Sequence, residues 1–475
     1  MDTPRGTAPR AGLVLVASCL AQFMVVLDVS VVNVALPSLR DALGFDAAGL
    51  QWVVNTYTLA FAGFLLLGGR AADVFGRRRV FLAGLVLFGA ASLVGGLANS
   101  PGLLLAARAA QGLGGAVLAP ASLTILTTTF AEGAARSRAL GAWAAVGGLG
   151  GATGGLAGGV LVHLLSWRWI FLVNVPVVIG TVVLAAAVVR ETRAATRPPM
   201  DVGGAVLATG GLVALVYGVV SSESRSWTSP LTWGAFVLAA AALAAFVVLQ
   251  RRVAAPLVPL GIFRHRAVTT ANVVMFGVAS GMFSMWYFVS LHMQSVLGFD
   301  ALAAGLAFLP QSLSIVVGSQ LASRLLPRTG VRPLLVGGTA LTAAGFAWFA
   351  LLSASDGWVG GVLGPGVVVS LGMGLTFTPL ASAATSGIEA SRAGLASGLL
   401  TTSRQTGGAI GLAVLATLAT AHTAALLGAG VPAPVALTAG TTRAFTVAAV
   451  VVGASAVVAA TLPRTPVPVR ERQMA

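Results

Sequence analysis

The residue least suited to its surroundings is an aspartate inside a long apolar run. Asp28 is the only charged residue between Ala11 and Leu39, within the stretch LDVSVVNVALP. A carboxylate in the middle of a membrane-spanning helix costs about 2.5 to 3.5 kcal/mol to insert, and intramembrane acids usually face a cavity. Two chemistries are open to Asp28. It either takes up and releases a proton, or it serves as the fixed structural partner of a buried cation.

A cation that could pair with this acid lies in a second apolar run. Arg108, in LAARAAQGLGGA, is the only charged residue between Leu103 and Phe130, and a buried guanidinium must be paired or hydrated. Snorkelling to the membrane surface is the alternative, because Arg108 lies only about 10 Å along its segment. Gln111 follows three residues later on the same helical side and could share a partner. Together, Asp28 and Arg108 predict a proton-dependent switch.

The amino-acid composition indicates which kind of structure must hold Asp28 and Arg108 in place. The 475 residues are 57% hydrophobic and 9% charged, with a mean hydropathy of +0.93, so one water-soluble core cannot hold them. We therefore predict an all-α polytopic membrane protein. A single cysteine, Cys19, excludes an intramolecular disulfide, and four scattered histidines predict neither a metal site nor a cofactor. All 28 basic residues are arginine, so the lysine of an ATP-binding phosphate loop is absent.

Apolar segments of about 20 residues predict fourteen membrane-spanning helices. Their cores are 13–36, 48–68, 80–98, 102–126, 139–162, 169–189, 202–220, 231–249, 267–291, 302–323, 333–353, 359–384, 393–420 and 443–462. Alternating loops then hold 22 of the 28 arginines on one side. The positive-inside rule predicts that this side, with both termini, is cytoplasmic. The high net charge therefore reflects topology, and we expect no nucleic-acid partner.

An internal repeat divides the fourteen segments. GRAADVFGRRR, residues 69–79, aligns with SRLLPRTGVRP, residues 323–333, at an offset of 254 residues. The same offset places Ser137 on Ser391, and Gly150 and Gly154 on Arg404 and Gly408. We predict a six-helix bundle in residues 1–200, two inserted helices in 201–252 and a second six-helix bundle in 253–475. Parallel halves of this kind are typical of transporters, with the binding site between them.

Several of these stretches together resemble the major facilitator superfamily, and within it the fourteen-spanner drug/proton antiporters. The stretches are LDVSVVNVALP, GRAADVFGRRR, LAARAAQGLGGA, SWRWIFLVNVP, LGFDALAAGLAFLP, SRQTGGAIG and the glycine series of the fifth segment. The resemblance implies a major facilitator fold in a bacterial cytoplasmic membrane. It implies a functional monomer that moves a small molecule and protons across the lipid bilayer.

Two glycine-containing motifs gain roles from this resemblance. In the first loop motif, the family uses the matching aspartate and arginine as a conformational latch, which implicates Gly69, Asp73, Gly76, Arg77 and Arg78. The second half has Pro327 at the aspartate position, so such a latch is asymmetric. In the fifth segment, the antiporter helix has its glycines at Gly141, Gly150, Gly154, Gly158 and Gly159. Gly155 stands where the family usually has proline, so the kink that proline would cause is in doubt here, although glycine also permits a bend.

The other candidates are polar or aromatic residues of the spanning segments that could line a cavity or contact substrate. Arg404 lies near the middle of its segment, where it either couples transport or is fixed to backbone carbonyls. His292 is either a titrating cavity residue or, as we expect, a hydrogen-bonded histidine at the membrane interface. The full set is Gln22, Asn33, Asn55, Tyr57, Gln111, Trp143, Trp286, His292, Phe377, Arg404 and Gln405.

The function expected from these features is proton-coupled export of small amphipathic or hydrophobic compounds by alternating access. A proton-linked uptake symporter shares the fold, and only the family motifs favour export. An integral-membrane enzyme would need clustered His, Asp, Glu or Cys residues near one interface, and the sequence has no such cluster. We therefore expect a transporter and not an enzyme.

Overall fold

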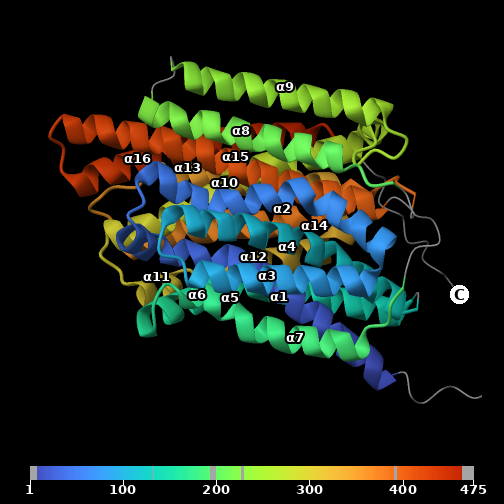
Figure 1. Cartoon of the computed structure of the whole chain (residues 1–475). Helices are drawn as coiled ribbons and strands as arrows, with labels where there is room; N and C mark the ends of the chain where they lie inside the picture. Colours follow the sequence, from blue (N-terminus) through green and yellow to red (C-terminus); the bar gives the residue numbers. More distant parts are fainter. Residues whose placement is uncertain (1–7, 132, 193–198, 226–228, 390–392, 463–475) are drawn as a thin grey trace, which may run out of the picture.

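The computed structural model describes residues 8–131, 133–192, 199–225, 229–389 and 393–462, and in these ranges it is helical (Figure 1). The first seven α-helices are α1 Ala8–Leu43, α2 Ala47–Phe75, α3 Arg77–Gly96, α4 Pro101–Thr129, α5 Ala134–Leu164, α6 Trp169–Leu172 and α7 Asn174–Val188. The next two are α8 Val202–Arg225 and α9 Pro230–Arg252. A 3-10 helix, η1 Leu260–Arg264, precedes α10 Arg266–Ser295, α11 Ala301–Ala307, α12 Leu309–Thr329 and α13 Val331–Phe349. A π-helix, η2 Trp358–Leu363, leads into α14 Gly364–Thr385, α15 Ala393–Gly428 and α16 Ala433–Ala460.

Local sequence explains where several of these helices begin and end. The side chains of Asp46, Ser100 and Asp300 accept hydrogen bonds from backbone N–H groups in the first turns of α2, α4 and α11. Gly76 and Gly330 have φ values of 108° and 80°, which let the chain turn sharply between α2 and α3 and between α12 and α13. Polar caps and glycines therefore divide the apolar sequence into separate helices.

The predicted segments all form helices, and their capacity to span a membrane can be judged individually. Twelve helices or joined helix pairs of the described chain are long and apolar enough to cross a bilayer. Helix α5 makes a thirteenth if its two parts, which meet at 45° near Gly151, are one span. The remaining predicted segment forms α13, which has 19 residues and includes Arg332 in its first turn. A polytopic all-helical membrane protein is confirmed, and the fourteen-span count is consistent with it.

The two halves repeat the same helix packing. Helix α1 packs on α5 as α10 packs on α15, and α2 packs on α4 as α12 packs on α14. Ser30 donates to the carbonyl of Gly150 at 3.2 Å, and Ser280 donates to that of Gly407 at 2.9 Å. These contacts correct the single 254-residue offset in the fifth segment.

In the structure, the counterparts of Gly150 and Gly154 are Gly407 and Gly411, not Arg404 and Gly408, because Gly154 abuts Ser30 as Gly411 abuts Ser280. A uniform offset fails here because the loops of the two halves differ in length. The repeat itself is retained in the packing of the helices.

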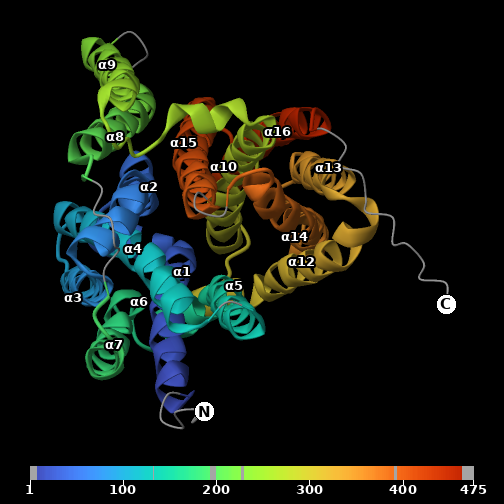
Figure 2. The same ribbon diagram turned by 90° about the vertical axis from the view of Figure 1, so that its right-hand side faces the viewer.

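The inserted pair lies at the edge of the molecule (Figure 2). Helices α8 and α9 pack on each other, and α8 also contacts α2 of the first half and α15 of the second. The α2–α8–α15 contact is an apolar cluster that includes Leu59, Val216, Ala409 and Ala413. The inserted pair therefore touches both halves through α8.

The bundle has two ends that differ in charge and in contact. We call the end that carries Arg77, Arg78, Arg79 and Arg190 the basic end, and the end that carries Gly44 and Gly298 the distal end. At the distal end, Ser290 and Gln294 of α10 donate to the carbonyls of Asn33 and Val34 of α1, at 2.8 and 3.1 Å.

Helix α5 also meets the second half near the distal end. Gly159 abuts the backbone of Ala301, and Gly155 lies against Gly305 and Phe308. Gly141, near the start of α5 at the basic end, faces open space, because a Cβ at this position would have no neighbour within 4 Å. Contacts between α5 and the second half are therefore concentrated toward the distal end.

Candidate functional site

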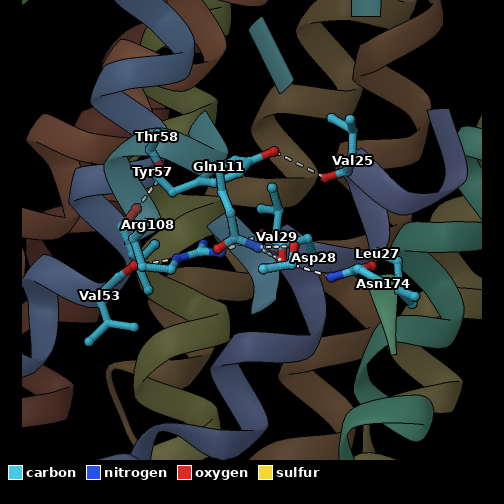
Figure 3. Close-up of polar contacts among 12 residues, drawn as sticks. Val25, Leu27, Asp28, Val29, Val53, Tyr57, Thr58, Arg108, Gln111 and Asn174 are labelled. Carbon is cyan, nitrogen blue, oxygen red and sulfur yellow. Dashed lines mark hydrogen bonds and ion pairs between the residues drawn. The ribbon is translucent and has the colours of Figure 1, made fainter. Parts of the chain in front are cut away.

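Asp28 and Arg108 lie together in the interior of the first half (Figure 3). The Arg108 Nη1 atom forms an ion pair with Asp28 Oδ2, although the two residues are 80 positions apart in the chain. Each residue is only 1% exposed. Arg108 therefore turns toward α1 and does not snorkel to a membrane surface, and the acid and the cation are sealed from solvent in this state.

The remaining hydrogen-bonding capacity of the pair is met by neighbouring helices. Arg108 Nε donates to the carbonyl of Val53 at 3.0 Å, and Arg108 Nη1 also donates to Gln111 Oε1 at 3.0 Å. Gln111 Nε2 donates to Asp28 Oδ1 at 2.9 Å and to Ser92 Oγ at 2.8 Å. One glutamine amide thus contacts both members of the ion pair. Because these hydrogen bonds replace those that the two charged groups would make with water, the pair can be buried.

Two further residues complete the surroundings. Asn174 Nδ2 donates to Asp28 Oδ1 at 3.4 Å, and Asn174 is brought there by the break between α6 and α7. The Arg108 guanidinium lies over the ring of Tyr57, 4.5 Å from its centroid, while the Tyr57 hydroxyl donates to the carbonyl of Val25 at 3.3 Å. The aromatic face adds a cation–π contact to the buried charge.

The second half has no counterpart of this pair among its described residues. The packing of Ser30 and Ser280 places Val278 at the position equivalent to Asp28, and the 254-residue offset places Val362, just before α14, at that of Arg108. Both valines are buried. This buried ion pair therefore belongs to one of two similar bundles.

The loop motif at the basic end forms a set of local contacts. Arg77 Nη2 and Asp73 Oδ1 form an ion pair at 3.3 Å, and the carboxylate of Glu191 accepts from the backbone N–H groups of Arg78 and Arg79 at 3.2 Å each. Arg78 also donates to the carbonyl of Ala186 at 2.6 Å. The only cation that Asp73 contacts among the described residues comes from its own loop.

The two glycines of this motif differ in how tightly they are surrounded. Gly69 lies beside Pro120 of α4, where a Cβ would make an ordinary van der Waals contact with the ring at 3.5 Å. Gly76 combines its positive φ with the Glu191 carboxylate, which occupies the space that a Cβ would need. The connector after α7 therefore packs directly onto the turn between α2 and α3.

The predicted antiporter glycines divide into two groups. Gly150, Gly154 and Gly158 lie against Phe23, Ser30 and Val31 of α1, while Gly159 lies against Ala301 of α11. Gly141 faces open space. Four of the five thus permit close helix contact, as small residues do in membrane proteins.

Most of the cavity candidates of the first half are engaged within the bundle. Tyr57 and Gln111 belong to the ion-pair network, and Asn33 donates to the carbonyl of Val29 at 3.2 Å in its own helix. Trp143 Nε1 donates to Ser122 Oγ at 3.1 Å, which joins α5 to α4. Gln22 is half-buried beside Gly147. Asn55 is fully buried, and its amide has no partner among the described residues.

The candidates of the second half are dispersed. His292 is 3% exposed and neither ring nitrogen has a partner in the described chain, which corrects the expectation of a hydrogen-bonded histidine at the interface. Arg404 Nε is likewise buried without a partner in that part of the chain, so this nitrogen is not bonded to a backbone carbonyl there. Trp286 and Phe377 pack against the main apolar cluster, and Gln405 is buried on α15.

Several residues of the site were not singled out from the sequence. Ser92 sits in a run of small apolar residues and carries no distinguishing signal. Asn174 had such a signal, because it lies in SWRWIFLVNVP. It is separated from Asp28 by 146 residues in the chain, however, so the sequence does not indicate their contact. Gln51 is a buried amide one turn before Asn55, and LQWVVNTY gave no reason to separate it from interfacial polar residues.

Comparison with known proteins identifies the fold and the family. The chain resembles a bacterial homologue of the human lysosomal transporter Spinster, solved in an inward-facing and unoccupied conformation, with a TM-score of 0.66 and 17% identity over 96% of this chain and 97% of that one. It also resembles the human organic anion transporter MFSD10, with a TM-score of 0.62 and 16% identity over 96% of this chain and 100% of that one. At these identities the likeness concerns the fold.

Sequence relatives are more similar. The cephamycin export protein CmcT of Amycolatopsis lactamdurans is 49% identical over 85% of this chain and 84% of its own length. The puromycin resistance protein pur8 of Streptomyces alboniger is 41% identical over 94% of this chain and 89% of its own. The family model of the Major Facilitator Superfamily matches residues 18–412. The chain therefore belongs to the major facilitator superfamily, whose members are membrane transporters of small molecules and not enzymes.

Proposed function

We propose that the protein exports small amphipathic or hydrophobic compounds, antibiotics or other secondary metabolites among them, in exchange for protons. The proposal of proton coupling rests on the buried ion pair of Asp28 and Arg108. Asp28 is the one acidic residue in the fourteen predicted membrane-spanning cores. A buried carboxylate that must lose its charge partner to move is suited to a proton-dependent step. The relatives named for cephamycin export and puromycin resistance support the direction and the substrate class.

The coupling follows from where the pair lies. With Asp28 charged, the ion pair holds α1 against α4. A proton on Asp28 removes one charge and leaves Arg108 with Gln111 and the Val53 carbonyl as its partners. Breaking one side of a buried pair costs about 3 to 5 kcal/mol, which is enough to shift a two-state equilibrium by more than a hundredfold.

Helix α1 transmits this step to the distal end. Asn33 and Val34, which accept hydrogen bonds from α10, lie only five and six residues beyond Asp28 on the same helix. A rotation or shift of α1 at Asp28 therefore changes its contacts with the second half. Alternating access follows: a proton from the outside on Asp28 discharges the bound compound or breaks the pair of Asp28 and Arg108, and its release to the cytoplasm resets the carrier.

The orientation proposed for this cycle is that the basic end and both termini are cytoplasmic. The 22 arginines of the predicted inner loops support it through the positive-inside rule. The membrane is the bacterial cytoplasmic membrane, since the two sequence relatives described above are bacterial. We further propose that a monomer suffices, with moving halves at residues 1–200 and 253–475 and the inserted pair at 201–252 beside them.

Roles for the other candidate residues follow from the same cycle. Gly69, Asp73, Gly76, Arg77 and Arg78 act as the latch at the basic end. The α5 glycines that make close contacts, Gly150, Gly154, Gly158 and Gly159, form the tightly packed face on which the halves pivot. Substrate contacts are proposed for the polar and aromatic candidates of the interior, namely Gln22, Asn33, Asn55, Trp143, Trp286, His292, Phe377, Arg404 and Gln405.

The test is expression in a bacterial host that lacks its own efflux pumps, with puromycin, lincomycin and cephamycin C as the compounds. We expect reduced susceptibility to at least one, and proton-driven accumulation of that compound in everted vesicles that stops when an uncoupler collapses the gradient. Uptake in the opposite direction would favour the symporter instead. Transport that persists without a gradient would contradict proton coupling.

A further inference from the structure

Two neighbouring amides of α2 are buried without hydrogen-bond partners. Gln51 and Asn55 are both 0% exposed, and none of their four amide oxygen and nitrogen atoms has a partner among the described residues. By contrast, Tyr57 and Thr58 of the same helix donate to the carbonyls of Val25 and Val54 at 3.3 and 2.8 Å. Buried polar groups are nearly always paired, so an unpaired set needs an explanation.

The position of Gln51 and Asn55 on α2 explains why their amides have no partners. Gln51, Asn55 and Leu59 follow one another at one-turn spacing, so they share a face of α2. Leu59 packs in the cluster formed with Ala409 and Ala413 of α15 and Val216 of α8. Asn55 and Gln51 continue this face toward the distal end, where α2 begins and α15 finishes (Figure 1). The two amides therefore lie along the contact between the two halves, on the part that is closed here.

The charged groups near the two amides limit which chemical groups could form hydrogen bonds with them. Asp28 and Arg108 are committed to each other and to Gln111, on the side of α2 that faces α4. Two amides about 6 Å apart along a helix offer both donors and acceptors but no net charge. They are suited to an uncharged group that also donates and accepts hydrogen bonds.

We propose that Gln51 and Asn55 form a neutral hydrogen-bonding subsite for amide, carbonyl or hydroxyl groups of the transported compound. The subsite becomes available when α2 and α15 separate at the distal end, and it is closed in the present state. This inference rests on the proposed export function and specifies its substrate chemistry. Apolar or cationic parts of the substrate are recognised elsewhere in the interior.

The experiment compares two probes that differ in hydrogen bonding. Puromycin carries amide and hydroxyl groups, whereas the tetraphenylphosphonium cation carries no hydrogen-bonding group. Transport of each is measured in everted vesicles for the wild type, Asn55→Leu, Gln51→Met and a matched control, Gln311→Met. Gln311 is also a buried amide without a described partner, but it lies against Gly366 of α14 inside the second half.

We expect Asn55→Leu and Gln51→Met each to raise the KM for puromycin about three- to tenfold, the value of one hydrogen bond, with tetraphenylphosphonium unchanged within about twofold. Gln311→Met should leave the ratio of the two KM values unchanged. Equal changes for both probes would assign the amides to the opening of the halves and overturn the subsite, as would no change for either. If the wild type does not export puromycin, the comparison uses lincomycin or cephamycin C, whichever it exports, in its place; if it exports none of these compounds, the proposed function itself is contradicted and the subsite with it.

Discussion

Arg108 of α4 reaches across the first half to form an ion pair with Asp28 of α1, and Gln111 contacts both partners with one amide. The arrangement makes the charge state of one carboxyl group a condition for the packing of two helices. Because the same helix α1 also carries the carbonyls that bind α10, the first half and the closed distal end are connected within two turns of one helix.

The first prediction concerns the stability of the ion pair. Arg108→Ala leaves the Asp28 carboxylate buried and unpaired, and we expect it to lower the free energy of unfolding by about 3 to 5 kcal/mol. The double variant Asp28→Asn, Arg108→Gln removes both charges and should recover much of that loss without recovering transport. Unfolding of the purified proteins in detergent and SDS mixtures measures both. A single variant as stable as the wild type would mean that the carboxylate is neutral or solvated.

The second prediction concerns Gln111. Replacing it by leucine removes the bonds to Asp28, Arg108 and Ser92 while keeping a side chain of similar size. Hydrogen bonds to charged groups contribute about 1.5 to 3 kcal/mol, so Gln111→Leu should destabilise the fold by an amount in that range and alter the pH profile of transport. Gln250 of α9 is also a buried glutamine that donates to a carboxylate, Asp201 Oδ2 at 2.6 Å, so Gln250→Leu is the control and should leave the pH profile unchanged. Identical pH profiles for Gln111→Leu and the wild type would show that Gln111 has no part in the proton step.

The third prediction uses two glycines of α5. Gly158 lies against Val31 of α1, whereas Gly141 faces open space. Gly158→Leu should therefore overpack the α1–α5 contact and cost about 1 to 3 kcal/mol, with loss of transport. Gly141→Leu, the same change on the same helix, should be tolerated. Thermal unfolding and vesicle transport check this, and equal sensitivity of the two sites would refute the assignment of Gly158 to a close contact.

The fourth prediction concerns Gly76 in the turn at the basic end. Gly76 and Gly298 both have positive φ, but only Gly76 has a carboxylate, that of Glu191, in the place of a Cβ. Alanine at either site forces an unfavourable backbone conformation that costs about 1 to 3 kcal/mol. Gly76→Ala should cost more than Gly298→Ala, because its φ of 108° lies farther from the left-handed helical region than the 70° of Gly298 and because it displaces Glu191 from the start of α3. The displacement should also slow transport. Equal losses of stability in the two variants would show that the Glu191 contact contributes nothing.

Much of the fold was accessible from the sequence because a membrane imposes a simple length rule. Apolar runs of about 20 residues predicted the helices, and the acid and the arginine in such runs marked Asp28 and Arg108 as candidates, whose proximity rested on the resemblance to the family. The duplication was also visible in the loop motif. The helices and the duplication are local or periodic signals, so they could be read without three-dimensional information.

The remainder depended on packing that no local pattern encodes. Asn174 reaches Asp28 only because the helix breaks between α6 and α7. Ser92 reaches Gln111 because α3 packs on α4 with this side chain facing it. The register of the repeat in α5 and α15 is set by Ser30 and Ser280, which a constant offset misplaces. The lack of described partners for Asn55 and His292 is likewise a property of the closed packing and not of their sequence neighbours.

The central claim, that protonation of Asp28 drives export, is tested most directly by Asp28→Asn. The substitution keeps the size of the side chain and removes the proton site, and its folding is checked by expression level and by monodisperse purification. In everted vesicles with an imposed proton gradient, we predict that export by this variant falls to the level seen without a gradient. Full gradient-driven export by well-folded Asp28→Asn would contradict the account.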